Sequence, residues 1–399
     1  MVSKLELIFV LVLIILISVI LIYGFKHKER KYTGTIITPP PQATNMSLRD
    51  VKVTVYYEPI NAKASDGRAA VDLLIPMKTD FILRGYFKWG SCLDWYPWVG
   101  LHCTYQEHLK SLSELSNLIS QLKRERPNLI FGGVITFSHV DPKDTYADGT
   151  LIGDDWKQMA FYNKNGKLID FSGGYVADIA SPLWRKWITG WAEKMVDAGV
   201  DSFFFDQHFM AAEFKIKQGA DMLSTAIEYE KYYMEIVNEV RAYAASKNRT
   251  VLISFNWGAD VIKKVGSLPN GIKTLKIMYD EMDYVVASTN PRDFNTTPPT
   301  LTEDWPSVKS TLAAAGVNLP IVTFLDSSGK CDWCQLYKFA QLSKQDQINY
   351  LTALYDDTKA NGILFAYHVW GGEDKLVPSR YDSVKYGTYD AMLEFAKSS

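Results

Sequence analysis

The sequence shows no excess of charge of either sign, few cysteines and no internal repeat that is visible by eye. Its 399 residues include 43 Lys and Arg against 45 Asp and Glu, for a net charge of −2. A domain that binds nucleic acid usually carries a clear basic excess, so we expect no nucleic acid partner. No glycine-rich phosphate loop follows the first strand that we predict in the main sheet, which argues against an open dinucleotide-binding sheet. With 47% hydrophobic and 22% charged residues, the composition is that of a globular protein.

One long apolar run is present at the amino terminus. Leu7 to Phe25 carries no charge. At ~1.5 Å per residue it spans ~28 Å, about the thickness of a bilayer core. No small-residue cleavage site follows it, so we predict an uncleaved transmembrane anchor in residues 1–25 rather than a removed signal peptide. A basic and proline-rich stalk then occupies residues 26–49, and the folded domain occupies residues 50–399.

Two sets of signals disagree about the side of the membrane that holds this domain. Most basic residues near the apolar run follow it, which by the positive-inside rule places the domain in the cytoplasm. The proline-rich stalk, the two local pairs of cysteines and the N-x-Ser/Thr sequons at Asn45, Asn248 and Asn295 favour the outside. We predict a single-pass protein of the cell membrane whose domain is extracellular.

Short apolar runs alternate with amphipathic helical patterns along the folded domain. Val51 to Tyr57 alternates in hydrophobicity and predicts an added strand at the edge of the domain. A polar insertion from Ser138 to Gly174 predicts a small hairpin around Asn163 to Gly166. Eight apolar runs that alternate with helices predict an α/β fold, the (β/α)8 TIM barrel. The eight predicted strands are Phe81–Trp89, Leu129–Phe137, Tyr175–Ile179, Gly199–Asp206, Thr250–Asn256, Tyr284–Ser288, Pro320–Asp326 and Gly362–His368.

The stretch from Gly199 to Phe209, GVDSFFFDQHF, contains the first candidate for a catalytic residue. It runs through apolar positions and then changes at once to Asp206, Gln207 and His208. Loops at the carboxyl ends of parallel strands hold the chemistry of such folds, so Asp206 is our candidate catalytic carboxylate. The alternative is that Asp206 only caps the next helix or closes a turn.

Other polar and aromatic residues follow the remaining predicted strands. Because strand ends converge on one face of a barrel, we expect these residues to line one site. Aromatic residues make up 13% of the chain, and flat rings near strand ends suit the C–H faces of sugars. We predict substrate binding by Trp89, Asp178, His208, Asn256, Trp257, His368 and Trp370, with Trp95 and Trp333 as further stacking candidates.

The run from Ala177 to Asp206, ADIASPLWRKWITGWAEKMVDAGVDSFFFD, resembles the middle of glycoside-hydrolase-like barrels. In those families a strand-three Asp is followed by a Pro-x-x-Arg helix, and then by Ala-Gly-x-Asp and an apolar strand that ends in a catalytic Asp. The close match covers this run, and the rest of the chain matches only in architecture. The resemblance implies that Asp206 is a nucleophile or base, and it does not select one family.

The second carboxylate is harder to assign. Glycoside cleavage needs two carboxyl groups, ~5–5.5 Å apart for retention or ~6.5–9.5 Å apart for inversion. Asn256 and Ser288 stand where many of these families place a Glu, which departs from the family pattern. We choose Asp326, at the end of another buried strand, with Glu213 and Glu373 in reserve. The alternative is that Asp326 only caps the loop that follows it.

These observations predict a glycoside hydrolase or transglycosidase that acts on an extracellular polysaccharide or glycan. The alternative, from another class, is a non-catalytic carbohydrate-binding or cell-surface protein that retains the barrel. No His-x-His follows the first predicted strand of the main sheet, as it would in metal-dependent amidohydrolase barrels. Single histidines at strand ends more often bind ligand or backbone, so we predict no catalytic metal and no cofactor.

The four cysteines fall into two loops. Cys92 and Cys103 follow the first predicted strand, and Cys331 and Cys334 follow the seventh. Outside the cell each local pair could form a disulfide across its own loop. Alternatively, all four could bind one structural zinc ion, because only the eighth strand separates the first from the seventh. The spacing is not typical of zinc sites, so we favour the disulfides Cys92–Cys103 and Cys331–Cys334.

Overall fold

The computed structural model describes most of the predicted folded domain. The described residues are 47–56, 68–89, 92–93, 104–171, 174–325, 335–369 and 387–398. The predicted anchor, Leu7 to Phe25, and the stalk up to residue 46 lie outside them. None of the helices in the described ranges combines the length and the hydropathy of a membrane span. These segments all belong to one compact unit, Ile37–Ser399.

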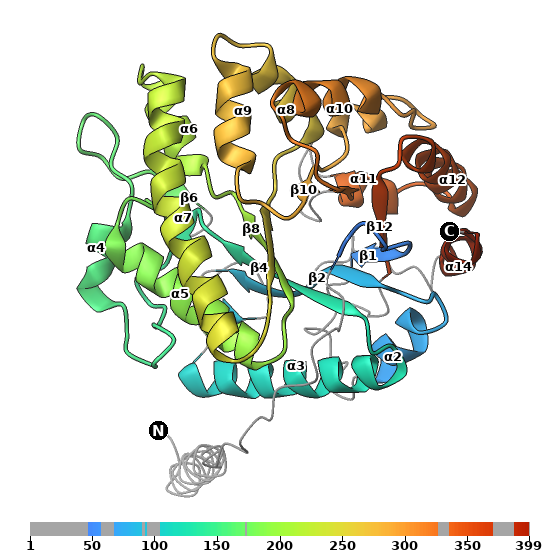
Figure 1. Ribbon diagram of the computed structural model, residues 1–399, viewed down its shortest axis with the longest axis horizontal. Helices are drawn as coiled ribbons and strands as arrows, with labels where there is room; N and C mark the ends of the chain where they lie inside the picture. Colours follow the sequence, from blue (N-terminus) through green and yellow to red (C-terminus); the bar gives the residue numbers. More distant parts are fainter. Residues whose placement is uncertain are drawn as a thin grey trace, which may run out of the picture. The chain divides into compact units, whose positions relative to one another are not determined.

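Eight parallel strands form a barrel at the centre of this unit (Figure 1). They follow one another around the sheet in chain order, and Asn256 and Val286 form a parallel bridge between its two ends. The N–H of Trp257 donates to the Val286 carbonyl at 3.1 Å across the same junction. The predicted (β/α)8 barrel is therefore confirmed. Its strands are β1 (Thr54–Tyr56), β2 (Phe81–Trp89), β4 (Ile130–Thr136), β8 (Ser202–Asp206), β9 (Leu252–Phe255), β10 (Val285–Val286), β11 (Ile321–Thr323) and β12 (Leu364–His368).

Two predicted strands take different places from those expected. Val51 to Tyr57 does not add an edge strand, because β1 pairs with both β12 and β2 inside the barrel sheet. Both faces of β1 are buried, one inside the barrel and one under helices, so its alternation does not indicate an exposed face. Tyr175 to Ile179 does not join the barrel. Its strand β7 (Gly174–Val176) pairs antiparallel with β5 (His139–Val140) and β6 (Asp170–Phe171) in a separate sheet.

This separate sheet belongs to an insertion that follows the carboxyl end of β4. Tyr162 and Leu168 form an antiparallel bridge on either side of Asn163 to Gly166, which confirms the small hairpin predicted there. The insertion is tied to the barrel by Lys88 of β2, whose ammonium lies 3.0 Å from the carboxylate of Asp144. Both side chains are fully buried, and burial raises the pKa of Asp144 to about 6.

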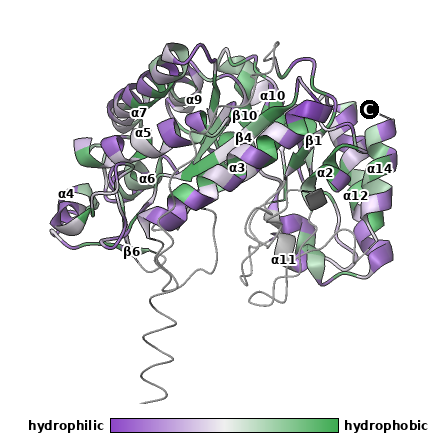
Figure 2. Cartoon of the chain, turned by 90° about the horizontal axis from the view of Figure 1, so that it is seen from below, coloured by the Kyte–Doolittle hydropathy of each residue, from purple (hydrophilic) through white to green (hydrophobic). Residues whose placement is uncertain are grey.

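Helices cover the outside of the barrel, whose strands are largely hydrophobic (Figure 2). Helix α5 shows how the sequence achieves this: Ser181 caps it, Pro182 starts it, and Trp184, Trp187 and Trp191 are fully buried beneath it. The main helices are α2 (Arg68–Leu74), α3 (Tyr105–Glu125), α5 (Pro182–Asp197), α6 (Met210–Lys217), α7 (Met222–Ser246), α8 (Ala259–Gly266), α9 (Gly271–Tyr279), α10 (Trp305–Ala314), α11 (Gln335–Ala340), α12 (Lys344–Ala360) and α14 (Tyr389–Lys397); the insertion adds η1 (Gly153–Asp155) and α4 (Trp156–Met159), and η2 (Pro291–Asn295) follows β10.

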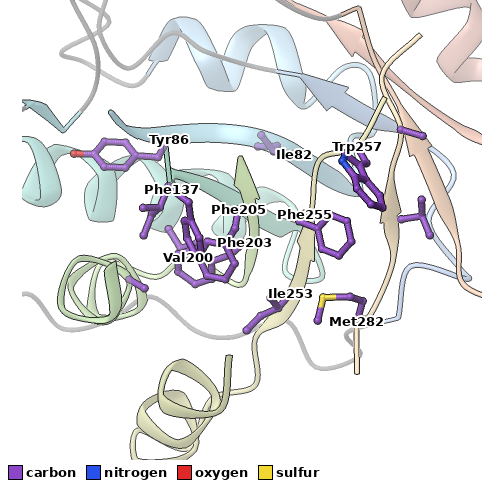
Figure 3. Close-up of a cluster of buried hydrophobic side chains, with 14 of the residues drawn as sticks. Ile82, Tyr86, Phe137, Val200, Phe203, Phe205, Ile253, Phe255, Trp257 and Met282 are labelled. Atoms are coloured by element: carbon purple, nitrogen blue, oxygen red, sulfur yellow. The ribbon is translucent and has the colours of Figure 1, made fainter. Parts of the chain in front are cut away.

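Side chains alternate between the inside and the outside of the barrel along each strand. In β8, Phe204 belongs to the cluster inside the barrel. Phe203 and Phe205 pack in the larger cluster between strands and helices, together with Phe255 of the next strand (Figure 3). Because Asp206 follows Phe204 by two residues, its side chain turns toward the inside, at the carboxyl end of the strand. The alternation therefore directs this carboxylate into the mouth of the barrel.

A bulge interrupts β2 where it pairs with β4. Ile82 pairs with Phe131 and Tyr86 with Gly133, so four steps along β2 match two steps along β4. A Cβ at Gly132 would come within 3.0 Å of two carbonyl oxygens of β2, so the bulge requires glycine there. The residues between the two pairs on β2 are Leu83, Arg84 and Gly85.

Candidate active site at the mouth of the barrel

Five barrel strands each bring one polar side chain to the carboxyl end of the sheet. Asp206 lies beside Thr136 in the register of β8 with β4, and Tyr56 lies beside His368 in the register of β1 with β12. Asn256 directly follows β9, the neighbour of β8. The carboxyl ends of barrel strands are where enzymes of this fold hold their reactive groups. We therefore take these residues as the candidate active site.

Asp206 is the carboxylate at the centre of this set. The side-chain amide of Asn256 donates a hydrogen bond to Oδ1 of Asp206 at 3.4 Å. The backbone carbonyl of Asp206 accepts a hydrogen bond from the N–H of Phe137 at 2.9 Å. Burial raises the pKa of Asp206 above its usual range. The guanidinium of Arg84 is the largest opposing influence, followed by the hydrogen bonds from Asn256 and from the backbone of Gln207. The protonation of Asp206 is thus set by a balance between burial and one nearby cation.

The turn after Asp206 is strained and held from the neighbouring strand. Gln207 has φ 55°, in the left-handed region that side chains other than glycine rarely adopt. Its Oε1 accepts a hydrogen bond from the hydroxyl of Ser138, which follows β4. Non-glycine residues in this conformation persist where surrounding contacts impose it, and such sites cluster at functional positions. The contact with Ser138 therefore fixes the turn that carries Asp206.

Arg84 reaches the mouth from the bulge in β2. Its Nη1 donates to the hydroxyl of Tyr56, and its guanidinium lies 4.0 Å from the ring centroid of Phe87. The ring of Tyr56 stacks on His368 at 4.2 Å and on Phe324 at 4.9 Å between centroids. These contacts hold the guanidinium in one place, because both of its neighbours are themselves packed.

The structure brings three predicted site residues together and leaves two others outside the mouth. Asp206, Asn256 and His368 lie at the carboxyl ends of their strands. His208 is buried among aromatic rings, 3.9 Å from the centroid of Phe255. Burial lowers its pKa to about 3, so the imidazole is neutral at physiological pH. Trp257 is also buried in the outer cluster and offers no open face for stacking (Figure 3).

Two carboxylates considered from the sequence have other partners. Oδ1 of Asp178 accepts from the N–H of Ala180 and from the hydroxyl of Tyr229, both at 3.0 Å, and so shapes the turn before α5. Glu213 lies on α6, half exposed, with its carboxylate 3.6 Å from the ammonium of Lys217.

Several predicted residues lie outside the described part of the chain. The side chains of Trp89 and Cys92 are outside it, although both residues have a described backbone, in β2 and in β3 (Cys92–Leu93) respectively. The proposed partner carboxylate, Asp326, and the reserve candidate Glu373 also lie outside it. The same holds for the other cysteines and tryptophans of the predicted site: Cys103, Cys331, Cys334, Trp95, Trp333 and Trp370. Their assignments stay predictions.

Tyr56 and Arg84 are site residues that the sequence analysis missed. The alternation around Tyr56 predicts an edge strand, whereas its place inside the barrel depends on pairing with β12, far along the chain. Arg84 is a charged residue inside the apolar run FILRGYFKW and is followed by glycine. A charge in a buried strand next to Gly is a signal for a bulge, and it was available in the sequence.

Within the segments that the structure describes, no group of three or more His, Cys, Asp or Glu side chains could hold a metal ion. The described part of the mouth includes the carboxylate of Asp206, the guanidinium of Arg84, the imidazole of His368, the phenol of Tyr56, the amide of Asn256 and the hydroxyl of Thr136. This set can bind polar ligands, stabilise charge and exchange protons at Asp206. The fold and site thus define a (β/α)8 barrel with a partly buried carboxylate in its mouth.

Solved structures similar to this chain include a glucanotransferase, a glycoside hydrolase domain and an alpha-amylase. The cyclomaltodextrin glucanotransferase CldA matches with a TM-score of 0.47 and 13% identity, over 87% of this chain and 80% of that chain. The glycoside hydrolase domain of PelA from Pseudomonas aeruginosa matches with a TM-score of 0.40 and 12% identity, over 79% and 94%. An Anoxybacillus alpha-amylase matches with a TM-score of 0.44 and 12% identity, over 91% and 76%. No protein-family model matches the sequence, and no curated protein matches it. These similarities select no family.

Proposed function

We propose that the protein is a glycoside hydrolase or transglycosidase in which Asp206 is the reactive carboxylate. The observation that carries this proposal is the setting of Asp206: it ends β8 in the mouth of the barrel, next to Asn256 and under the influence of Arg84. The strained turn at Gln207 supports it, because backbone strain collects where a side chain must be aimed. The resemblance of residues 177–206 to glycoside-hydrolase-like barrels supports the same assignment.

In this proposal Asp206 acts as nucleophile or base, and a second carboxyl group donates the proton to the leaving oxygen. Cleavage with retention requires the two groups ~5–5.5 Å apart, and inversion requires ~6.5–9.5 Å. Asp326 remains the proposed partner, because it follows a buried strand as Asp206 does. The amide of Asn256 and the hydroxyl of Tyr56 would then bind sugar hydroxyls beside the reacting bond.

The proposed substrate is an extracellular polysaccharide or glycan. This rests on the predicted anchor, the sequons and the paired cysteines of the sequence, with Trp89, Trp370, Trp95 and Trp333 as proposed stacking residues. The same features support a single-pass protein of the cell membrane with its barrel outside the cell and its cysteines oxidised. Intact mass with and without reductant tests the last point: a gain of about four hydrogens on reduction supports two disulfides, and four free thiols or bound zinc would oppose them.

A non-catalytic carbohydrate-binding role is the second candidate. One observation favours it: Asn256 and Ser288 stand where many glycoside-hydrolase-like barrels place the second carboxylate. A hydrolase needs two such groups, whereas a binding protein needs none. Both candidates predict that the protein binds carbohydrate, and only the enzyme is expected to cleave it.

The experiment that separates them uses the purified full-length protein in detergent. Glycan arrays identify ligands, and a panel of aryl glycosides and of the bound glycans measures cleavage. Turnover that is lost in Asp206→Asn supports the enzyme. Binding without turnover supports the second candidate, and absence of both contradicts a carbohydrate function.

A further inference from the structure

The bulge in β2 directs the side chain of Arg84 into the mouth of the barrel, where it contacts Tyr56. We propose that Arg84 is a positioning residue for Asp206: the bulge and the contacts with Tyr56 and Phe87 fix a guanidinium in the mouth of the barrel, where its positive charge favours the ionised form of this carboxylate. This inference rests on the proposed function, because it takes Asp206 as the reactive group. It adds a residue to the site and a means of controlling its reactivity.

The first support is the backbone that presents Arg84. The bulge inserts two extra residues of β2 opposite β4, since four steps on one strand match two on the other. Glycine at position 132 makes room for it, and a Cβ at Gly85 would also come within 3.0 Å of the ring of Phe131. Bulges re-aim side chains and are common next to active sites. At Gly132 the clash would be with backbone oxygens of Ile82 and Leu83, so the bulge leaves no room for a side chain there.

The second support is the way the guanidinium is held. Arg84 donates to the hydroxyl of Tyr56 and lies against the ring of Phe87. Tyr56 is in turn stacked on His368 and Phe324. A guanidinium is charged at every physiological pH and has weaker hydration than an ammonium, so it tolerates such a half-buried setting. A long side chain that is already immobilised loses little further entropy when it acts on a neighbour.

The third support is electrostatic. Burial favours the neutral form of Asp206, and Arg84 is the largest influence in the opposite direction. The other strand ends around Asp206 present Thr136 from β4, Asn256 from β9, Tyr56 from β1 and His368 from β12. Among these described side chains, Arg84 is the one that is positive at all working pH values. Removing Arg84 would therefore raise the pKa of Asp206 further, because the main influence that opposes burial would be lost.

A direct test measures the ionisation of Asp206 without any substrate. The unfolding free energy of the full-length protein is compared with that of Asp206→Asn across pH, first with Arg84 present and then in the Arg84→Met background. The pH at which the difference changes reports the pKa of Asp206. We expect Arg84→Met to raise it by about one unit or more, and Arg84→Lys, which keeps the charge, to raise it less. A change below about 0.3 unit in Arg84→Met would overturn the inference.

A second measurement uses the pH profile of kcat/KM once a substrate is known. With Arg84→Met, the limb that depends on Asp206 moves to higher pH. A shift of the acid limb assigns Asp206 as base or nucleophile, and a shift of the alkaline limb assigns it as the acid; both support a tuning role for Arg84. An unmoved profile overturns it. Failure of the wild-type protein to turn over any glycoside removes the proposed function, and the stability measurement still decides the role of Arg84.

Two further variants control for general damage. Arg292→Met removes an exposed arginine whose guanidinium lies 2.9 Å from the Asp260 carboxylate, and it should leave both the Asp206 ionisation and the pH profile unchanged. Tyr56→Phe removes the hydroxyl that anchors Arg84 and keeps the ring and the charge, so we expect a smaller shift in the same direction. If Arg84→Met does not fold, Arg84→Lys and Tyr56→Phe replace it in the test. A measurable rise in the pKa of Asp206 in either variant supports the role of Arg84, and no rise in either variant contradicts it.

Discussion

The guanidinium of Arg84 donates a hydrogen bond to the hydroxyl of Tyr56, and this contact joins strands β1 and β2 at the mouth that also holds the candidate catalytic carboxylate. Arg84 comes from the bulge of β2, and Tyr56 ends β1. Both residues depend on features of the fold that are remote in sequence: the glycine of β4 at position 132 and the pairing of β1 with β12.

Substituting Gly132→Ala should destabilise the protein. The added methyl group would lie within 3.0 Å of the carbonyl oxygens of Ile82 and Leu83, and a rigid backbone cannot move away easily. We expect a loss of about 2–3 kcal/mol in the free energy of unfolding, as for other overpacked core sites. Denaturant titration measures it, with Gly258→Ala as control, where the nearest atom lies at 3.4 Å. Equal stability of the two variants would contradict a requirement for glycine at position 132.

Substituting Gln207→Gly should separate stability from activity. Glycine accepts the observed φ of 55° without strain, a gain of about 1–2 kcal/mol, and loses the hydrogen bond from Ser138, a cost of about 1 kcal/mol. We therefore expect nearly unchanged thermal stability and a kcat lowered about tenfold, because Asp206 is held less firmly. Ser138→Ala removes the same bond and should lower kcat in the same way.

Lys78→Gly is the matched control for this prediction. Lys78 is exposed, has the same φ of 55° and lies in the turn before β2, away from the mouth. It should gain about 1 kcal/mol in stability with no change in kcat. Full activity of both Gln207→Gly and Ser138→Ala would show that the turn at Gln207 is only structural.

His208 should make the protein less stable in mild acid. Its pKa is lowered from 6.5 to about 3 by burial, so the folded state holds the neutral imidazole while the unfolded state takes up a proton below pH 6.5. Stability is then lost as pH falls from about 6.5 toward 3, by up to about 1.4 kcal/mol per pH unit. From pH 7 to 5 this amounts to about 2 kcal/mol.

The variant His208→Phe tests this prediction. Phenylalanine fits the surrounding aromatic rings, and it removes the proton uptake in the unfolded state. Its unfolding free energy should therefore fall less than that of the wild type between pH 7 and pH 5. Identical pH dependence of the two proteins would show that His208 is not buried in its neutral form.

Much of the fold followed from local patterns, because each buried strand is an apolar run and each helix carries one apolar face. Two strands are predicted in the wrong place, because strand pairing depends on residues that are distant in the sequence. Residues 175–179 are apolar enough for a barrel strand, yet β7 pairs antiparallel with two strands of the insertion. Strand β1 is only three residues long, and its place was decided by partners at both ends of the chain.

The candidate site could be predicted where alternation continues to the end of a strand. Phe204 is inside the barrel, so Asp206 is inside as well, and Asn256 and His368 follow the same logic. His208 does not follow this alternation. The left-handed turn at Gln207 lies before it, and its imidazole packs against Phe255 in the cluster between strands and helices. Arg84 lies on a bulge, where the period of two no longer applies.

The most direct test of the central claim is the activity and stability of Asp206→Asn on a confirmed glycoside substrate. The substitution keeps the shape of the side chain and removes its charge. We predict a kcat lower by several orders of magnitude, with the unfolding free energy changed by about 1 kcal/mol or less. Full activity of Asp206→Asn would contradict the account, because Asp206 would then be a turn residue and not the reactive carboxylate.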